Sequence, residues 1–363
     1  QQKEITQSFA LSLANKNHPK AQKWLHMVDE DFLNESVVQW RIADVLRKQN
    51  WELILRELES FPKALHQTKQ WQYWHSRSLI ETNNKEQGVA ALKQLANTRH
   101  YYGFLAAGYL NIPFNLQDEP IKTTEIEKNT LLQHSAAKRA FELFHIGKYS
   151  DARKEWNYWL SQLNDHDKLI ASTISYDEKW FDRAIFTLSK VGYLNDVDLR
   201  FPLAFHKNIT KYSKKNNIDP AWAFAIARRE SSFMPDANSG VGAKGLMQIM
   251  LGTAKQLERK RVSTKYLLNA KNNIKLGTKY LKILSDQYKG NNVLATASYN
   301  AGPHRVKKWA KEAKGMPIDM WIETIPFKET REYVKSVMAY QQIYQHKIGK
   351  KEPLFADLVK NKI

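Results

Sequence analysis

The sequence of 363 residues contains no cysteine. Disulfide scaffolds, thiolate metal sites and cysteine nucleophiles are therefore excluded. Glycine and proline are scarce, at 14 and 11 residues, which leaves few turn signals for a fold built from many short strands. The longest uncharged stretch, 101–117, is interrupted by Pro113 and by several amides, so it falls short of the roughly 20 apolar residues that a membrane-spanning helix needs.

A secretion signal is also missing from the first residues, which show no basic segment followed by an apolar one. Either the protein is cytosolic or a signal peptide has already been removed. Apolar residues make up 42% and charged residues 26% of the chain, which is typical of globular proteins and argues against disorder. The length predicts two or three domains, because a domain typically has about 100–200 residues.

Acidic residues are scarce in the second part of the chain. Residues 1–200 hold 26 Lys and Arg against 25 Asp and Glu, a net charge of +1. Residues 201–363 hold 30 against 12, a net charge of +18. Such an excess favours a polyanionic partner, either nucleic acid, an anionic membrane or an acidic wall polymer, and on charge alone nucleic acid ranks first. A solvated basic surface is the alternative.

Helical repeats are predicted in the first part, because apolar residues recur there with a period near 3.6. Trp40 and Trp74 are separated by one repeat length of the tetratricopeptide kind, about 34 residues, which favours successive helix pairs. A second, slightly shorter repeat relates 145–152 to 176–183. The segment 111–130 lacks apolar periodicity and is the predicted linker.

Tryptophan is concentrated before residue 200, where eight of the 11 occur. One interpretation is a stacking surface for bases or sugars. We prefer the other, in which Trp156, Trp159 and Trp180 fill a local core between helices.

A strong helix start stands at Asp219 and Pro220, with Asp as the N-cap and Pro in the first helical position. The predicted helix continues to Glu230, which shares a face with Ile226 and Ala227, four and three residues earlier. The carboxyl group is therefore expected to point toward a core from the last turn of the helix.

The expected burial of Glu230 and its place in the last turn of the helix would both affect its ionisation, because burial and the negative end of a helix raise the pKa of a carboxyl group. A glutamic acid that stays partly protonated near neutral pH can act as a general acid. The alternative is that Glu230 pairs with Arg228 or Arg229 and merely ends the helix.

Three further segments combine glycine with polar residues. Segment 239–250 has three glycines in six residues, which permits positive φ angles, but it lacks the ending of a phosphate loop. Gln248, inside its apolar end, must find a hydrogen-bond partner or face a ligand. A helix of small residues closes with Tyr-Asn-Ala-Gly-Pro at 299–303, and a last helix opens near Pro326.

Four motifs thus follow one another: Glu-Ser at 230–231, Gly-Leu-Met-Gln at 245–248, Tyr-Asn-Ala-Gly at 299–302, and Ile-Pro-Phe at 325–327 with Glu-Thr-Arg-Glu-Tyr-Val at 329–334. With these motifs the sequence resembles the soluble lytic murein transglycosylases, closely from about residue 196 and loosely before it. Leu251 is a departure, since the family commonly has proline after Ile-Met; this would affect a turn but not the chemistry.

The resemblance implies an all-α fold, in which an α-superhelix of helix pairs accompanies a lysozyme-like catalytic domain with at most a minimal β element near 240–248. The expected domains are a superhelical domain over 1–115, a helical linker domain over 116–195 and a catalytic domain over 196–363. The superhelical part is short for a full ring, so the chain is expected to begin inside that domain. A periplasmic location with the signal peptide removed is also implied.

The implied partner is peptidoglycan rather than nucleic acid, and the implied reaction cleaves the β-1,4 bond between N-acetylmuramic acid and N-acetylglucosamine. Glu230 would act first as acid and then as base, and a 1,6-anhydro end would form without water. Asp236, the nearest second carboxylate, is expected to be an exposed loop residue. No cofactor or metal is implied, the 11 histidines lack ligand spacing, and His304 is expected to be exposed.

Six secondary site residues follow from the motifs. Ser239 and Tyr299 would orient the N-acetyl group or the intermediate. Polar sugar contacts would come from Gln248 and Asn300, while Met250 would line the groove and Glu329 would hold saccharide or peptide.

Three other functions compete with this one. A noncatalytic helical scaffold that binds murein or another polyanion would retain its function when Glu230 is replaced. A hydrolase of the same fold would give products with an added water. A nucleic-acid binder would show steep salt dependence, but the sequence has no recognisable nucleic-acid fold signature.

Overall fold

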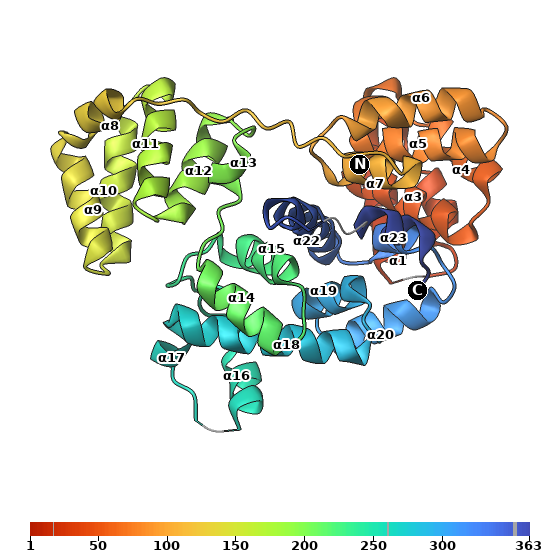
Figure 1. Cartoon of the computed structure of the whole chain (residues 1–363). Helices are drawn as coiled ribbons and strands as arrows, with labels where there is room; N and C mark the ends of the chain where they lie inside the picture. Colours follow the sequence, from red (N-terminus) through yellow and green to blue (C-terminus); the bar gives the residue numbers. More distant parts are fainter. Residues whose placement is uncertain (17, 260, 351–353) are drawn as a thin grey trace. The chain divides into compact units, whose positions relative to one another are not determined.

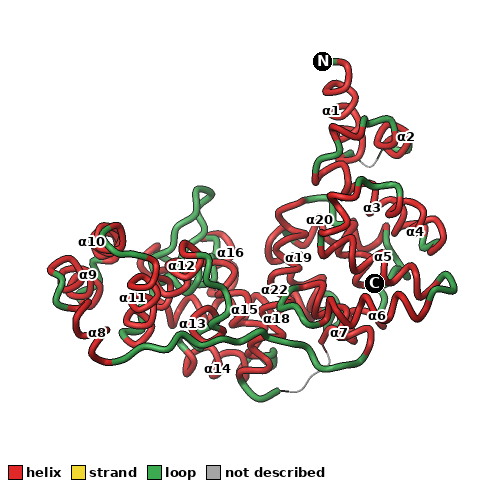
Figure 2. Tube along the Cα trace, turned by 90° about the horizontal axis from the view of Figure 1, so that it is seen from above, coloured by secondary structure: helices red, strands yellow, loops and turns green. Residues whose placement is uncertain are grey.

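The computed structural model describes residues 1–16, 18–259, 261–350 and 354–363. Among these residues helix accounts for 71% and strand for 1%, and no sheet forms, so the predicted all-α class is confirmed (Figure 2). Two isolated antiparallel bridges fall within 238–249, close to the predicted β element. A third, between Pro317 and Lys362, lies outside it.

The chain forms two compact units. Unit 1 comprises residues 1–116, 284–342 and 349–363, and unit 2 comprises residues 117–283 and 343–348. Two long helices, α18 (Ala270–Gln287) and α22 (Lys328–Lys347), contain residues of both units.

Unit 1 is built mainly from short helices connected by tight turns (Figure 1). They are α1 (Gln2–Asn15), α2 (Ala21–His26), η1 (Glu30–Phe32), α3 (Glu35–Lys48), α4 (Trp51–Glu59), η2 (Lys63–Gln67), α5 (Lys69–Glu81), α6 (Lys85–Ala96), α7 (Tyr101–Leu110), α19 (Asn292–Ala301), α20 (Pro303–Glu312), α21 (Ile318–Thr324) and α23 (Leu354–Lys360).

The predicted first repeat is confirmed in α3 to α6, where consecutive helices pack against one another. Trp40 and Trp74 occupy the first helices of two successive pairs, and both are buried. The turn between α3 and α4 is short because Gln49 ends α3 with a φ of 51° and the Asn50 side chain caps α4 by accepting from the Leu53 N–H. Two later helices complete this part, since α21 packs on α3 and α23 on α7.

Unit 2 contains the remaining helices. They are α8 (Glu125–Leu132), α9 (Ser135–His145), α10 (Tyr149–Ser161), α11 (Asp165–Asp177), α12 (Phe181–Val191), α13 (Val197–Arg200), α14 (His206–Lys215), α15 (Pro220–Ser231), α16 (Leu251–Glu258) and α17 (Thr264–Leu268). The helices α9 to α12 lie side by side (Figure 1). Trp156, Trp159 and Trp180 are buried in the apolar core that this part of the chain forms. These tryptophans therefore fill a core, as we preferred, and do not form an open stacking surface.

The second repeat is one position longer than predicted, so the predicted register was wrong. The helices α9 and α11 end at His145 and Asp177, and α10 and α12 begin at Tyr149 and Phe181. Gly147 and Lys179 take the left-handed conformation at equivalent turns. The error arose because the turn residues of the two units differ in type, so aligning their aromatic residues shifted the register.

The predicted linker over 111–130 is confirmed for residues 111–124, which no helix covers, but residues 125–130 belong to α8. Part of it is nevertheless held in unit 2 by backbone and side-chain bonds. Glu119 N–H donates to the Asn195 carbonyl at 2.9 Å, and Ile121 N–H donates to the Asp196 carboxylate at 2.8 Å. These bonds attach the linker to the segment that follows Gly192 at the end of α12.

Within the described part of the chain, no helix combines the length and the apolar character required to cross a membrane.

Candidate active site

Glu230 lies in the last turn of α15, as predicted. Asp219 caps the start of this helix by accepting from the Ala221 N–H at 3.0 Å, and Gln345 donates to the other Asp219 carboxylate oxygen at 2.9 Å. Residues 221–228 are buried, whereas Glu230 itself is partly exposed. The expectation that Glu230 is buried against a core is therefore corrected: the continuous buried stretch of α15 ends at Arg228, and Glu230 is only partly buried.

The arginine before it has its own anchors. Arg228 donates through Nε to the Arg200 carbonyl at 2.8 Å and through Nη1 to the Ser232 hydroxyl at 2.9 Å. Its guanidinium lies over the Phe201 ring, 5.5 Å from the centroid. Arg228 thus fastens the end of α15 to the end of α13.

The residue after Glu230 ties the helix to the glycine-rich segment. Ser231 is buried, and its hydroxyl donates to the Leu246 carbonyl at 2.7 Å. Ser231 belongs to the Glu-Ser motif, but the sequence analysis assigned it no role. Its position next to Glu230, at the end of the predicted helix, was the feature that could have pointed to it. This bond connects the position of Glu230 to that of the segment 238–249.

Ser239 and Gln248 both bond within this segment. The Ser239 hydroxyl accepts from the Ala243 N–H at 2.9 Å. Gln248, with a φ of 48°, donates its amide nitrogen to the carbonyls of Ala237 at 3.2 Å and Gly245 at 2.8 Å. The requirement that this amide find partners is met inside the loop, so a sugar contact from Gln248 would use its amide oxygen.

A buried amide that the sequence analysis missed fixes the same segment from α18. Asn273 is fully buried, donates to the carbonyls of Lys244 and Leu267 at 2.8 and 2.9 Å, and accepts from the Met247 N–H at 2.7 Å. A Cβ atom on Gly245, whose φ is 73°, would come within 2.5 Å of the Asn273 amide nitrogen. Glycine is therefore required at this position both by conformation and by space.

Met250 and Leu251 lie where the segment enters α16. Met250 is the N-cap residue and is 43% exposed, which suits a residue that lines a groove. Leu251 is the first helical residue, a position that tolerates proline well, so the departure from the family pattern alters a helix start rather than a turn.

Asp236 is not the exposed loop carboxylate that we expected. Its side chain is only 26% exposed and forms a bidentate ion pair with Arg153 of α10, with one N–O distance of 3.0 Å and a second, shorter contact. The pair joins α10 to the loop that follows Glu230.

Three predicted site residues belong to unit 1. Tyr299 and Asn300 lie in the last turn of α19 and are partly exposed, and Glu329 is exposed in the first turn of α22. Asn300 donates to the Glu329 carboxylate at 3.4 Å and accepts from the Thr330 hydroxyl at 2.7 Å. Asn300 and Glu329 are thus brought together and line one cavity of about 600 Å³.

A buried polar network, which the sequence did not reveal, holds the segment just before Glu329. Glu323 of α21 is fully buried and accepts from Gln39 at 3.2 Å, Gln70 at 2.8 Å, Tyr102 at 2.6 Å and Lys335 at 3.0 Å. Burial alone would raise the pKa of Glu323, but the Lys335 charge and the bonds from Tyr102 and Lys335 outweigh it and lower that pKa.

A metal site is not indicated in the part of the chain that the structure describes, where no group of three or more His, Cys, Asp or Glu side chains is placed to hold an ion. His304 is exposed, as predicted.

Comparisons with known proteins agree on one family. Residues 207–322 match the transglycosylase SLT domain, and residues 130–197 match the soluble lytic murein transglycosylase L domain. Residues 324–353 match the soluble lytic transglycosylase helical domain.

Whole-chain relatives point the same way. A soluble lytic murein transglycosylase of Salmonella typhimurium is 31% identical over 348 residues, which cover 90% of this chain and 54% of that protein. The Escherichia coli protein of that name is 29% identical, with 89% and 53% covered. The chain therefore spans about half the length of the curated relatives that it matches.

Solved structures extend the match to the fold. The lytic transglycosylase Slt of Pseudomonas aeruginosa superimposes with a TM-score of 0.88 at 38% identity, covering 96% of this chain and 58% of that one. That protein was solved as an inactive mutant with a glutamate replaced by glutamine. The 70 kDa soluble lytic transglycosylase of Escherichia coli gives a TM-score of 0.92 at 28% identity, with 99% and 59% covered.

Fold and motifs together define a lytic transglycosylase architecture. The chain belongs to the soluble lytic murein transglycosylase family.

Proposed function

We propose that this chain cleaves peptidoglycan as a lytic transglycosylase, with Glu230 as its single acid and base. The observation that carries the proposal is the anchoring of Glu230: it is partly exposed at the end of a buried helix, and the next residue, Ser231, bonds to the Leu246 carbonyl of the motif segment. A partly exposed ionisable group at a well-anchored helix end suits proton transfer to a bound ligand.

In the first step, the Glu230 carboxylic acid donates its proton to the glycosidic oxygen between N-acetylmuramic acid and N-acetylglucosamine. The bond from this oxygen to C1 of the muramic acid breaks, and C1 acquires oxocarbenium character. The carbonyl oxygen of the substrate's own acetamido group supports this positive charge. A second carboxylate is then unnecessary, and the ion pair of Asp236 with Arg153 is consistent with a structural role for that acid.

In the second step, the Glu230 carboxylate takes the proton from the 6-hydroxyl of the same muramic acid. The oxygen attacks C1 and closes the 1,6-anhydro ring, so Glu230 returns to its acid form and no water is consumed. Ser239 and Tyr299 would orient the N-acetyl group or the intermediate, while Gln248 and Asn300 would contact the sugars. Met250 would line the groove, and Glu329 would bind saccharide or stem peptide.

We propose the same three-part organisation for the domains, with a superhelical part over 1–115, a linker domain over 116–195 and a catalytic domain over 196–363. The family matches at 130–197 and 207–322 support the last two boundaries. The helical-domain match at 324–353 lies inside the proposed catalytic domain. A periplasmic location, where peptidoglycan is accessible, follows from the same proposal.

The mass of the products tests the reaction. Purified sacculi are digested with the protein, and the released muropeptides are measured by mass spectrometry. Anhydro ends are about 18 Da lighter than hydrolysed ends, because one water is missing. Hydrolysed ends would indicate a hydrolase of the same fold, and intact sacculi with protein bound would indicate the noncatalytic scaffold.

A further inference from the structure

The cavity of about 600 Å³ that Asn300 and Glu329 line is also lined by Thr330, which the sequence analysis gave no role. Thr330 lies in the first turn of α22, and its side chain is buried. A threonine hydroxyl in a helix usually bonds to a carbonyl three or four residues earlier. This hydroxyl instead leaves its own helix and donates to the Asn300 Oδ1 atom of α19 at 2.7 Å.

The bond from Thr330 sets the orientation of the Asn300 amide. A carboxylate can only accept hydrogen bonds, so the amide nitrogen faces Glu329 and the amide oxygen faces Thr330. The bond from Thr330 is 2.7 Å long, whereas the bond to Glu329 is 3.4 Å long and exposed. Thr330 therefore makes the stronger contact, and the amide nitrogen keeps the capacity to donate to a ligand.

The end of α19, which carries Asn300, is held by its own contacts. The buried Ser298 hydroxyl donates to the Tyr288 hydroxyl at 2.8 Å, and Tyr288 in turn donates to the Pro303 carbonyl at 3.2 Å. These bonds fix the chain on both sides of Asn300. The main freedom left to this residue is the rotation of its side chain, which the bond from Thr330 restricts.

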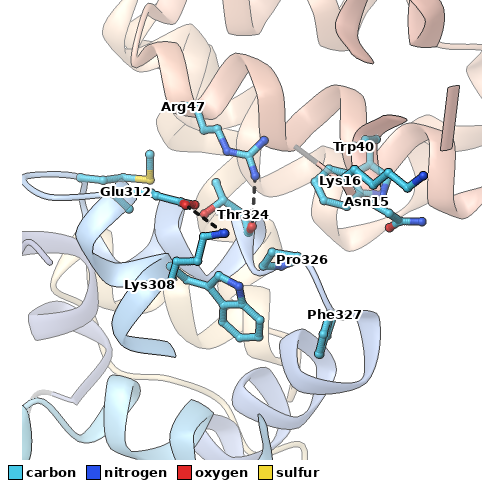
Figure 3. A pocket seen from close by; sticks show the side chains of 13 residues that line it. Asn15, Lys16, Trp40, Arg47, Lys308, Glu312, Thr324, Pro326 and Phe327 are labelled. Carbon is cyan, nitrogen blue, oxygen red and sulfur yellow. Dashed lines mark hydrogen bonds and ion pairs between the residues drawn. The ribbon is translucent and has the colours of Figure 1, made fainter. Parts of the chain in front are cut away.

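The start of α22, which carries Thr330, is held as well. The buried Arg331 donates through Nη1 to the Ile325 carbonyl at 2.8 Å and so closes the turn before the helix. Pro326 and Phe327 of this turn line the same cavity and an adjoining one of about 460 Å³, where Figure 3 shows both side chains. The hydroxyl therefore acts from a fixed position.

We propose that Thr330 is a positioning residue, which holds the Asn300 amide with its nitrogen on the side of Glu329, so that Asn300 serves a ligand as a hydrogen-bond donor. The inference rests on the proposed function, in which Asn300 contacts a sugar, and deepens it. The atom that Asn300 meets is then an acceptor, a carbonyl or hydroxyl oxygen of the glycan. Without the hydroxyl of Thr330 the amide oxygen loses its partner, and the side chain is free to rotate toward water.

Steady-state kinetics on soluble murein glycan strands tests this role. Thr330→Val keeps the shape of the side chain but removes the hydroxyl, and it should raise KM about 2- to 10-fold, the range for one hydrogen bond. The value of kcat should change little, because the contact is expected to be made equally in the ground state and the transition state. Thr330→Ser retains the hydroxyl and should restore most of the wild-type KM.

Substitutions of Asn300 separate positioning from packing. Asn300→Asp still accepts from Thr330 but cannot donate to a ligand, so its KM should rise at least as much as that of Thr330→Val. In the Asn300→Ala background, Thr330→Val should cause no further rise, because the amide that it orients is gone. Thr173→Val is the matched control and should leave KM unchanged, since it removes another buried hydroxyl, one that donates to the Ile170 carbonyl within α11.

Nuclear magnetic resonance of the full chain labelled with ¹⁵N-asparagine gives a readout that needs no turnover. The side-chain amide signal of Asn300 is identified by its loss in Asn300→Ala. It should shift in Thr330→Val and stay close to the wild-type position in Thr330→Ser. An Asn300 amide signal that does not move in Thr330→Val would overturn the positioning role.

The kinetic outcomes are equally decisive. An unchanged KM in Thr330→Val, the same rise of KM with and without the Asn300 amide, or a wild-type KM in Asn300→Asp would each overturn the proposal. Because Asn300 is partly exposed, its Asp variant keeps the test available even if Thr330→Val fails to fold. Absence of anhydro products from the wild type would instead overturn the proposed function, and the amide signal would still decide the orientation of Asn300.

Discussion

In the proposed mechanism Glu230 serves as acid and base in turn, and no other carboxyl group shares this work. Glu230→Gln preserves shape and hydrogen bonding but cannot donate a proton as a carboxylic acid. General acid–base help is worth about 10²–10⁴-fold in rate, and the loss should reach the upper part of this range or exceed it. The rate of anhydro-muropeptide release from sacculi measures the loss.

The melting temperature of the same variant shows whether the effect is chemical. It should be unchanged or higher, because the side chain is partly exposed and sits at the negative end of α15. Glu86→Gln, on an exposed position of α6, is the matched control and should retain full activity. Release by Glu230→Gln above about a tenth of the wild-type rate would remove this residue from the mechanism.

The ion pair of Arg153 and Asp236 holds the loop that follows α15. We expect Arg153→Gln and Asp236→Asn each to lower activity, and the double variant to lose little more than either one, because each single change already breaks the pair. A double-mutant cycle on the free energy of unfolding should give a coupling of about 0.5–3 kcal/mol. Strictly additive losses in the double variant would mean that the two residues act separately.

At the level of elements, the glycine-rich segment depends on one glycine above all. Gly245→Ala would put a Cβ atom within 2.5 Å of Asn273 and the Leu267 carbonyl, at a φ of 73°. The free energy of unfolding should fall by more than about 1 kcal/mol, and activity should fall with it because Ser231 bonds to the same segment.

Gly240→Ala provides the contrast within the same segment. A Cβ atom there meets nothing within 4 Å, so its unfolding free energy should stay within about 0.5 kcal/mol of the wild type. Denaturant unfolding of both variants makes the comparison. Equal stability of the two variants would show that the contacts of Asn273 do not fix the segment.

Local patterns were sufficient to predict several elements. Helical periodicity placed α3 to α6, and the Asp219 cap with Pro220 placed the start of α15, since these signals lie within a few residues of one another. The register of the second repeat was wrong because Gly147 and Lys179 take the same backbone conformation with different residue types.

Partners distant in sequence could not be predicted. Asn273 looks like an ordinary polar helix residue, and only folding brings it to the Met247 N–H. Gln39 and Glu323 are 284 positions apart, so nothing local indicates that they meet in a buried network. Glu230 could be proposed from the sequence because its helix end and its motif are local, whereas the ion pair of Asp236 required the position of α10.

At the scale of the whole molecule, the buried network around Glu323 should make unit 1 sensitive to acid. The pKa of Glu323 is lowered in the folded state, since the charge of Lys335 and the hydrogen bonds to the carboxylate outweigh burial. Its contribution to stability is therefore complete above the ordinary glutamate pKa of about 4.3 and is lost as pH falls through the lower folded value.

Glu323→Gln should reduce that acid dependence while lowering stability at neutral pH, because buried Lys335 loses the nearer and buried one of its two carboxylate partners, Glu323 at 3.0 Å, and keeps Glu332 at 3.4 Å. Melting temperatures of the wild type and the variant between about pH 3 and pH 7, a window set around the ordinary glutamate pKa, give both the acid dependence of stability and the stability at neutral pH. If the wild type and the variant lost stability in parallel below pH about 4.3, the network would not be the source of the acid sensitivity.

The net charge of +18 in residues 201–363 bears on how the molecule would reach its proposed substrate, murein. Stem-peptide carboxylates make murein acidic, so the attraction should act over a distance set by salt, about 10 Å at 0.1 M and about 3 Å at 1 M. Pelleting with purified sacculi across this range should show binding of the Glu230→Gln protein that weakens steadily as salt rises. Sacculi with amidated carboxyl groups are the control and should bind with less salt dependence. Binding that does not change with salt would mean that aromatic and hydrogen-bond contacts of the site, and not the basic surface, supply most of the binding free energy.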